Sequence, residues 1–371
     1  MRVLSLFDGI AGARQALKNL NIDCEYYASE IDKYAIQVAK NNHPDIIHIG
    51  DVKGIIIEDD YIFYNQDNDP MQNGGSFKSN MDLLIGGSPC QDLSISKRNR
   101  QNLGGKRSSL FFDYVRILKQ VKPKFFILEN VASMSNDAKN EITRNLFEVE
   151  PILINSFLLT AQHRKRLYWC GALQEDGSYK KVEISQPEDK GILLKDILED
   201  GDAEKLKSYC ITATYQNSCP QNYFEHGQRQ LVSKKPVKVG HFNKGGQGYR
   251  VYSSDGKSVC LSANGGGRGA KTGLYEIKGC AIRGRYKDNS KETQQILEIR
   301  EDKKTNCLTS VSKDSLVQIK DMVRKLTPTE CARLQGYPDF YHNGISNSQA
   351  YKCYGNSFTV PIIQHILRSI L

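Results

Sequence analysis

The thiol of Cys90, in the stretch GGSPCQDLSIS, has neighbours that suit nucleophilic chemistry. An apolar run at residues 83–85 precedes it and predicts a buried strand that ends close to the thiol. Pro89 restricts the backbone on one side, and residues 97–107 carry five basic and no acidic side chains on the other. Positive neighbours lower the pKa of a thiol and favour the thiolate, which is the reactive form. The alternative is a cysteine that only fills space in the interior, the usual fate of this residue.

A carboxylate and two arginines later in the chain could act on a substrate beside that thiol. Glu129 ends the apolar run FFILE. A carboxylate at the tip of a buried strand is partly desolvated, which raises its pKa and suits it to acid chemistry. Arg164 and Arg166, in QHRKR, would lie on one face of a strand, where guanidinium groups can hold a base oxygen or a carboxylate. Taken alone, the two arginines fit a solvated edge strand better.

Three further strand ends carry residues that suit a nucleoside. Gly9 and Gly12, in LFDGIAG, stand between an apolar run and a helical pattern, so the backbone there can approach a ligand. Glu30 ends the next apolar run, about twenty residues on, where an acid can bind ribose hydroxyls. Asp51 follows the third run and could accept a hydrogen bond from an adenine amino group. The alternative is that Glu30 and Asp51 only cap the helices that follow them.

Short apolar runs alternate with helical patterns over the first half of the chain. This alternation predicts an α/β fold with a doubly wound, mostly parallel sheet whose strands are buried on both faces. Strands are expected at residues 2–7, 24–30, 45–52, 81–87, 124–131 and 151–161. Helices are expected at residues 13–20, 33–41, 110–122, 326–337 and 351–371, and the last should pack back on the first domain.

The 371 residues suggest two domains, and the character of the chain changes after about residue 190. Residues 227–284 contain thirteen of the thirty glycines, and eleven lysines and arginines against two acidic residues. We therefore expect a catalytic domain at residues 1–190 plus 345–371 and a second, smaller β-rich domain at 191–344. The basic segment favours a polyanion such as nucleic acid, and a solubilising surface is the alternative.

The cysteine pattern and the hydropathy of the chain limit the classes of protein to which it can belong. The ten cysteines form no CxxC pair and the seven histidines no metal-ligand spacing, so we expect no metal site and a reduced, cytoplasmic protein. No apolar run approaches the ~18 residues of a membrane span. Asp8 interrupts the first apolar run too early for a signal peptide, and we expect no membrane contact.

As a set, these residues resemble the DNA (cytosine-5)-methyltransferases, in particular the bacterial and phage enzymes with a short recognition domain. The resemblance runs through nearly the whole chain and rests on LFDGIAG (6–12), Glu30, Asp51, SPCQ (88–91), ENV (129–131), QHRKR (162–166), RKLTPTECARLQGYP (324–338) and YGNS (354–357). The chain departs from the family pattern at Ala11, where a second glycine is usual, and at Asp92 and Leu93. Residues 279–323 are expected to add an extra hairpin unit.

The resemblance implies S-adenosyl-L-methionine as cofactor and a cytosine flipped out of double-stranded DNA as substrate. Cys90 would add to C6 of the base, Glu129 would bind or protonate N3, Arg166 would hold O2, and Arg164 would orient the site. The implied cofactor-binding residues are Phe7, Asp8, Gly9, Glu30, Ile31, Asp51, Val52, Pro89, Leu110, Asn356 and Ser357. The implied DNA-binding residues are Gln91, Ser94, Ser96, Arg98, Gln247, Arg250, Gly266 and Lys271.

Other functions share parts of this pattern. An RNA cytosine-5 methyltransferase would have the same fold and thiol, although the basic, glycine-rich domain favours duplex DNA. A non-catalytic DNA-binding relative is disfavoured by the intact Cys90, Glu129 and Arg166. A pyrimidine hydroxymethylase also uses a Pro-Cys thiol, but Glu30, Asp51 and Asn356 suit S-adenosylmethionine better than a folate. We expect a monomer, and the sequence specifies neither the DNA target site nor whether a cognate restriction endonuclease accompanies it.

Overall fold

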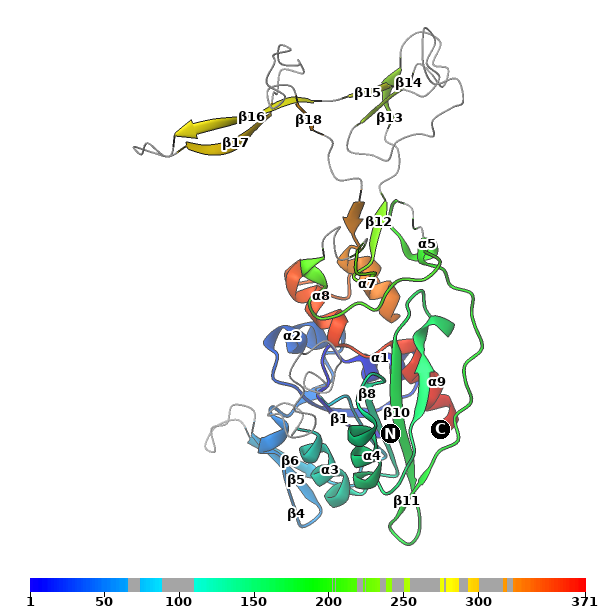
Figure 1. Ribbon diagram of the computed structural model, residues 1–371. Helices are drawn as coiled ribbons and strands as arrows, with labels where there is room; N and C mark the ends of the chain where they lie inside the picture. Colours follow the sequence, from blue (N-terminus) through cyan, green and yellow to red (C-terminus); the bar gives the residue numbers. More distant parts are fainter. Residues whose placement is uncertain are drawn as a thin grey trace. The chain divides into compact units, whose positions relative to one another are not determined.

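Figure 1 shows the computed structural model of the chain. The backbone is described for residues 1–65, 74–88, 110–201, 203, 205–218, 223, 225–233, 238–241, 250–253, 274–276, 278–286, 293–299, 316–318 and 323–371. Side chains are described for residues 1–64, 74–88, 110–201, 203, 205–218, 223, 225–232 and 325–371. The expected site residues outside the described part of the chain are Pro89, Cys90, Gln91, Ser94, Ser96, Arg98, Gln247, Gly266 and Lys271. Arg250 is described by its backbone alone.

The chain divides into two compact units. The first comprises Met1–Ile197, Lys205–Gln230 and Leu326–Leu371, and the second Leu198–Glu204 and Leu231–Lys325. These divisions differ from the boundaries expected near residues 190 and 345. The segments that precede Leu231 and follow Lys325 in the sequence make contacts within the first unit. The backbone N–H of Ile211 donates to the amide oxygen of Gln162 at 2.8 Å, and the guanidinium of Arg333 donates to the carbonyl of Ile197 at 2.9 Å.

The first unit is built on an eight-stranded sheet in the order β11-β10-β8-β7-β1-β2-β3, with β9 pairing with β10. The strands are β1 (Arg2–Leu6), β2 (Glu25–Ser29), β3 (Ile47–His48), β7 (Leu83–Gly86), β8 (Phe125–Val131), β9 (Ile152–Asn155), β10 (Lys165–Leu173) and β11 (Tyr179–Lys181). Neighbours from β8 to β3 are parallel, whereas β10 is antiparallel to β8, β9 and β11. The mostly parallel sheet expected from the sequence is confirmed.

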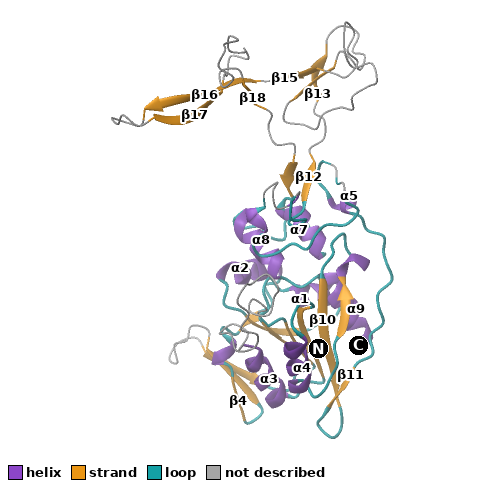
Figure 2. Cartoon of the chain, viewed as in Figure 1, coloured by secondary structure: helices purple, strands orange, loops and turns teal. Residues whose placement is uncertain are grey.

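The expected helices are also present in the first unit, except that the single helix expected at residues 351–371 is divided into two, with a break at residues 357–359 (Figure 2). They are α1 (Gly12–Asn19), α2 (Lys33–Asn42), α3 (Leu110–Val121), α7 (Pro328–Gln335), α8 (Asn347–Asn356) and α9 (Val360–Ile370); α4 (Asn136–Asn145) and the short α5 (Leu194–Ile197) were not expected. Thr327 starts α7 with a capping box, because its hydroxyl accepts from the N–H of Glu330 while the Glu330 carboxylate accepts from the N–H of Thr327. Gly336 ends the helix with φ 77°.

Apolar residues bury both faces of the central sheet. Leu4 of β1, Leu84 of β7 and Phe126 of β8 stand opposite one another and belong to one buried cluster with α3 and α4. The alternate residues Val3 and Ile127 point to the other face and are also fully buried. Helices α1 and α9, which pack against each other, cover that second face (Figure 1). Burial on both sides explains why these strands read as continuous apolar runs.

A small antiparallel sheet between β3 and β7 was not expected. It consists of β4 (Ile56–Glu58), β5 (Tyr61–Asn65) and β6 (Gly74–Lys78). Its inner face includes the buried Phe77, whose ring stacks on Tyr27 of β2 with centroids 3.7 Å apart. Its outer face leaves Ile56, Tyr61 and Phe63 exposed. The alternation of buried and exposed residues is that of a strand with one face on the core.

The second unit is β-rich, as expected. Its strands are β12 (Leu231–Ser233) paired with β19 (Val323–Lys325), β13 (Lys238–His241) with β14 (Arg250–Ser253) and β15 (Leu274–Glu276), and β16 (Lys278–Tyr286) with β17 (Thr293–Ile299) and β18 (Leu316–Gln318). The antiparallel hairpin of β16 and β17 falls in the segment where an extra hairpin unit was expected. Across the described residues of the chain, no helix is long and apolar enough to cross a membrane.

Candidate active site

A cavity of about 330 Å³ opens at the carboxyl ends of the parallel strands in the first unit. Ligands of doubly wound folds bind at this edge of the sheet, because the loops there leave a crevice. Of the residues expected at the site, it is lined by Phe7, Gly9, Glu30, Ile31, Asp51, Val52, Leu110, Glu129, Arg164, Arg166 and Asn356. Residues at or near one end of five strands, from α3 and from α8 therefore line the same cavity.

The carboxylate of Glu30 is fixed by backbone groups on both sides. One oxygen accepts from the N–H groups of Ile31 and Asp32, both at 2.8 Å, and the other accepts from the N–H of Gly9 at 2.8 Å. A carboxylate has about four lone-pair positions, so these three hydrogen bonds leave about one acceptor position. Since Glu30 lines the cavity, that position suits a hydroxyl group of a ligand such as a ribose.

Asp51 both caps a turn and lines the cavity. One carboxylate oxygen accepts from the N–H of Lys53 at 3.1 Å and starts a short 3₁₀ turn, Val52–Gly54. The capping alternative is therefore correct for this oxygen, although the side chain also reaches the cavity. Apolar surface lies nearby, since the side chain of Ile31 is 71% exposed beside the same cavity. Acceptors next to apolar side chains fit an adenosine group.

Asp8 does not line the cavity, contrary to its expected role as a cofactor contact. It is buried, with 4% of its surface exposed, and one carboxylate oxygen accepts from the hydroxyls of Ser5 and Tyr26, both at 2.6 Å. Its side chain therefore points into the protein while its neighbours Phe7 and Gly9 reach the cavity. Burial is the main reason why the pKa of Asp8 is raised from 3.8 to about 7.

The raised pKa makes the stability of the fold depend on pH. Between about pH 4 and pH 7 the folded state holds a proton on Asp8 that the unfolded chain has lost, so stability falls as pH rises through this window. Asp8→Asn removes this loss, so the variant should gain in melting temperature over the wild type as pH rises from 5 to about 7, with little further gain above. Thermal melts of both proteins across this range test it; parallel profiles would contradict the assignment.

Glu129 and Arg166 form an ion pair on the wall of the cavity. In the antiparallel pair of β8 and β10, Arg166 stands opposite Val131, so it shares a face with Glu129 two residues away. The Nε of Arg166 lies 2.8 Å from Oε1 of Glu129, and their side chains are 15% and 14% exposed. A carboxylate and a guanidinium held together at a cavity wall can bind an amide-like ring edge, which offers a donor or acceptor beside an oxygen.

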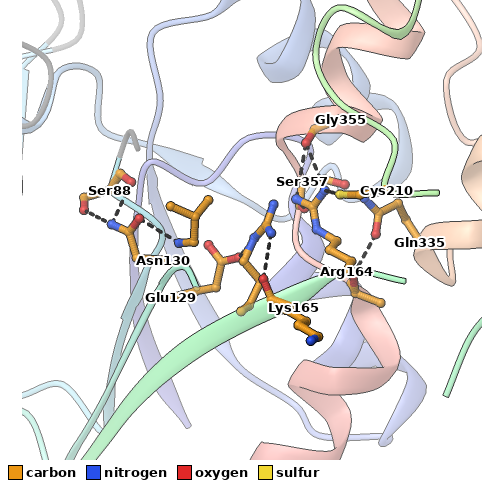
Figure 3. Close-up of polar contacts among 12 residues, drawn as sticks. Ser88, Glu129, Asn130, Arg164, Lys165, Cys210, Gln335, Gly355 and Ser357 are labelled. Carbon is orange, nitrogen blue, oxygen red and sulfur yellow. Dashed lines mark hydrogen bonds and ion pairs between the residues drawn. The ribbon is translucent and has the colours of Figure 1, made fainter. Parts of the chain in front are cut away.

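Asn130, next to Glu129, connects β8 to the end of β7. Its Nδ2 donates to the hydroxyl of Ser88 at 3.2 Å, and its Oδ1 accepts from the N–H of Val131 at 2.8 Å (Figure 3). Ser88 is buried and lines the cavity two positions before Cys90 in the chain. Ser88, which precedes Pro89 and Cys90 in the sequence, is therefore held in place at the cavity wall.

Arg164 is buried and holds the backbone around α8. Its guanidinium donates to the carbonyls of Gly355 at 3.2 Å, Ser357 at 3.0 Å and Ile211 at 3.2 Å (Figure 3). Arg164 precedes the first residue of β10, and it was expected to lie with Arg166 on one face of a strand. Its contacts place the end of α8, which carries Asn356, against the cavity. Ser357 contributes a carbonyl to this arrangement and does not line the cavity.

Two sets of contacts were not anticipated from the sequence. Lys352 of α8 forms an ion pair with Asp32 at 2.6 Å, and both line the cavity, so this pair joins two of its walls. Gln335, fully buried, donates to the carbonyl of Tyr354 at 2.8 Å and accepts from the hydroxyl of Thr359 at 2.7 Å. The sequence offered one signal for the first pair, a lysine two residues before the YGNS segment, and none for the second.

The first unit is thus a doubly wound α/β fold with a cavity at its strand ends and an acid-arginine pair on the cavity wall. A family model described as C-5 cytosine-specific DNA methylase matches residues 1–371. The chain belongs to this family and is a DNA (cytosine-5)-methyltransferase.

Similar proteins come from bacteria, phages and eukaryotes. The type II methyltransferase M.HhaI of Haemophilus parahaemolyticus is 30% identical over 380 residues, covering 100% of this chain and 94% of the relative. The orphan methyltransferase M.SPRI of Bacillus phage SPR is 28% identical over 453 residues, covering 100% and 97%. The solved structure of the Entamoeba histolytica methyltransferase EhMeth has a TM-score of 0.53 at 17% identity, covering 100% of this chain and 97% of that one. It shares the fold.

Proposed function

We propose that the enzyme transfers a methyl group from S-adenosyl-L-methionine to C5 of a cytosine flipped out of duplex DNA, through a covalent bond between the sulfur of Cys90 and C6. One observation carries this proposal. The Glu129–Arg166 pair and the acceptors Glu30 and Asp51 line the same cavity. A base held by the first pair would therefore lie beside a nucleoside cofactor held by the second.

Cytosine C5 is a poor nucleophile, so the enzyme must activate the ring. Glu129 binds or protonates N3 and Arg166 holds O2, so that the ring accepts electrons when the thiolate of Cys90 adds to C6. This addition makes C5 nucleophilic. S-adenosylmethionine supplies an electrophilic methyl group when bound. Removal of the C5 proton by a base then restores the double bond between C5 and C6 and releases Cys90.

The cofactor would be held by the residues whose side chains or backbone line the cavity. Glu30 would accept from the ribose, and Phe7, Ile31 and Asp51 would frame the adenosine. Asn356 would help to close the pocket, in a position set by the contacts of Arg164 to its two neighbours. Asp8 is left out of this set, because its side chain points away from the cavity.

The second unit, Leu231–Lys325, would read the DNA. Arg250 and Lys271 would contact phosphates, and Gln247 would fill the gap that the flipped cytosine leaves, with Ser96 as the second candidate. The loop Gln91–Arg107, with its basic side chains, would close over the flipped nucleotide. Phosphate contacts of this kind make DNA affinity fall steeply with salt.

Transfer of a radiolabelled methyl group from S-adenosylmethionine distinguishes this proposal from an RNA-directed enzyme. We expect label in duplex DNA and no label in tRNA transcripts at equal concentration, because the basic second unit is suited to a duplex. Bisulfite sequencing of DNA from cells that express the protein would then give the target site. Label in tRNA alone would identify an RNA methyltransferase, and label in neither would identify a non-catalytic relative.

A further inference from the structure

Asp8 belongs to a buried polar cluster that the catalytic proposal leaves without a role. The cluster consists of Ser5, Asp8 and Tyr26, joined by the two hydrogen bonds to Oδ1 of Asp8. The other oxygen, Oδ2, is buried and has no hydrogen-bond partner among the residues that the structure describes. A buried carboxylate with one oxygen unsatisfied is unfavourable when charged, so its proton is sensitive to small changes around it.

The cluster lies directly behind the wall of the cavity. The backbone around Asp8 is left-handed at Phe7, Gly9 and Ala11, with φ of 57°, 60° and 61°. Phe7 and Ala11 have a side chain, so the left-handed conformation is unfavourable for them unless other contacts stabilise it. The N–H of Asp8 donates to the carbonyl of Ser29 at 3.1 Å, in addition to the hydrogen bonds of its carboxylate. Asp8 is therefore an anchor of the segment that forms the cavity wall.

Glu30 connects this anchor to the cavity. Its carboxylate accepts from the N–H of Gly9, the residue after Asp8, and it repels a negative charge on Asp8. Water in the open cavity screens that repulsion. A ligand that fills the cavity removes this water, and the repulsion between the two carboxylates grows as the local dielectric constant falls.

We propose that Asp8 is a positioning residue that takes up a proton when the cofactor cavity is filled, so that cofactor affinity decreases as the pH rises through neutrality. The proposal rests on the proposed function, since it takes the cavity to be the adenosyl cofactor site. It assigns to Asp8 a role that is separate from direct contact with the cofactor.

The three phenols that face Asp8 do not titrate in the same range. The phenols of Tyr26, Tyr337 and Tyr341 each interact with it electrostatically, and burial raises the pKa of all three above the ordinary value of 10.0. They remain neutral near pH 7. The hydroxyl of Ser5 has no charge, and Glu30 is the negative neighbour described above. Asp8, with a pKa raised to about 7, is the member of this set placed to exchange a proton at neutral pH.

The sign and size of the effect follow from linkage. Binding is favoured by the protonated form of Asp8, so affinity is highest below about pH 7 and falls above it until Asp8 is ionised in both states. A shift of the Asp8 pKa by about 0.5 to 1 unit on binding gives about a threefold to tenfold difference in Kd between the two limits.

Calorimetric titration of the full-length enzyme with S-adenosylhomocysteine tests the proposal. This probe has no sulfonium charge, and its titratable α-amino group contributes equally to the profiles of the wild type and of Asp8→Asn, so the difference between the two profiles isolates Asp8. Titrations from pH 6 to pH 9, each in two buffers of different ionisation enthalpy, give both the Kd and the number of protons taken up. The wild type should lose affinity about threefold to tenfold across this range and take up a fraction of a proton near pH 7.

Two variants and one control separate a titrating Asp8 from a merely structural one. Asp8→Asn keeps an oxygen that can accept from Ser5 and Tyr26, and should lack the loss of affinity and the proton uptake near pH 7 that Asp8 gives the wild type. Tyr26→Phe removes one hydrogen bond from the carboxylate, which raises its pKa, so the midpoint of the profile should move to higher pH. Asp51→Asn, which alters a cavity carboxylate, should weaken binding at every pH and leave the slope unchanged.

The outcomes distinguish this inference from the proposed function. A flat wild-type profile, or a sloping profile retained in Asp8→Asn, would overturn the role of Asp8 and leave the cofactor site intact. Failure of the wild type to bind S-adenosylhomocysteine at any pH would overturn the cofactor site itself, and the inference with it.

Discussion

Cys90→Ala should eliminate methyl transfer and leave the binding of S-adenosylhomocysteine and duplex DNA nearly unchanged. In the proposed mechanism the thiol supplies the covalent step, and removal of the nucleophile from such a mechanism costs at least about 10⁴-fold in turnover. It contributes little to affinity, because its contacts with the substrate are formed mainly in the reaction. Radiolabelled methyl transfer measures the first effect, and calorimetry with fluorescence anisotropy of labelled DNA measures the second.

Cys24→Ala is the matched control for this variant. Cys24 is a half-buried free thiol that comes just before the first residue of β2. The opposite end of β2 lies at the cavity. Its removal should leave turnover within about twofold, since Cys24 does not line the cavity. Turnover of Cys90→Ala within tenfold of the wild type would show that another group attacks the base.

Glu129→Gln should lower kcat by about 10²- to 10⁴-fold, which is the range for loss of a general acid. Glutamine keeps the shape of the side chain and cannot deliver a proton to N3. The amide oxygen of glutamine can still accept from Arg166, so the variant removes the charge of the ion pair and keeps a hydrogen bond to the guanidinium. Single-turnover methylation with saturating cofactor and DNA isolates the chemical step.

Arg166→Lys provides the comparison on the other side of the ion pair. Lysine keeps the charge and loses the planar fork, so it should weaken turnover less than Glu129→Gln and should raise KM for DNA more than it lowers kcat. A Glu129→Gln enzyme with kcat within tenfold of the wild type would mean that Glu129 binds the base without proton transfer.

The parallel part of the fold could be predicted because buried strands leave a strong signal. The runs that precede Gly9, Glu30, Asp51 and Glu129 are rich in apolar residues, as strands buried on both faces are expected to be. Parallel strands bring their carboxyl ends to one edge, so these residues were expected to meet, and each of them lines the cavity.

Side-chain direction within a turn could not be predicted in the same way. Asp8 stands between two residues that line the cavity, and it was expected to do the same. Left-handed backbone at Phe7 and Gly9 turns its side chain toward Tyr26 instead. Such conformations at residues other than glycine depend on tertiary contacts, which no local pattern reveals.

Contacts between segments that are far apart in the sequence could not be predicted either. Arg164 reaches the carbonyl groups of Gly355 and Ser357, some 190 positions later in the chain. Backbone carbonyls are the same for every residue type, so the sequence does not mark them as partners. The sheet of β4 to β6 was missed for another reason: its strands are short, and Gly74 and Gly75 weaken the strand pattern of β6.

Covalent trapping tests the central claim most directly. Duplex DNA with 5-fluorocytosine at the target position should form a complex with the enzyme that survives denaturing electrophoresis and requires S-adenosylmethionine. Thiol addition and methyl transfer proceed, but fluorine cannot leave C5 as a cation, so the bond between Cys90 and C6 persists. Mass spectrometry of the digested complex should place the nucleotide on Cys90, and Cys90→Ala should form none. An adduct on any of the other nine cysteines, or one that forms on RNA and not on duplex DNA, would contradict this account.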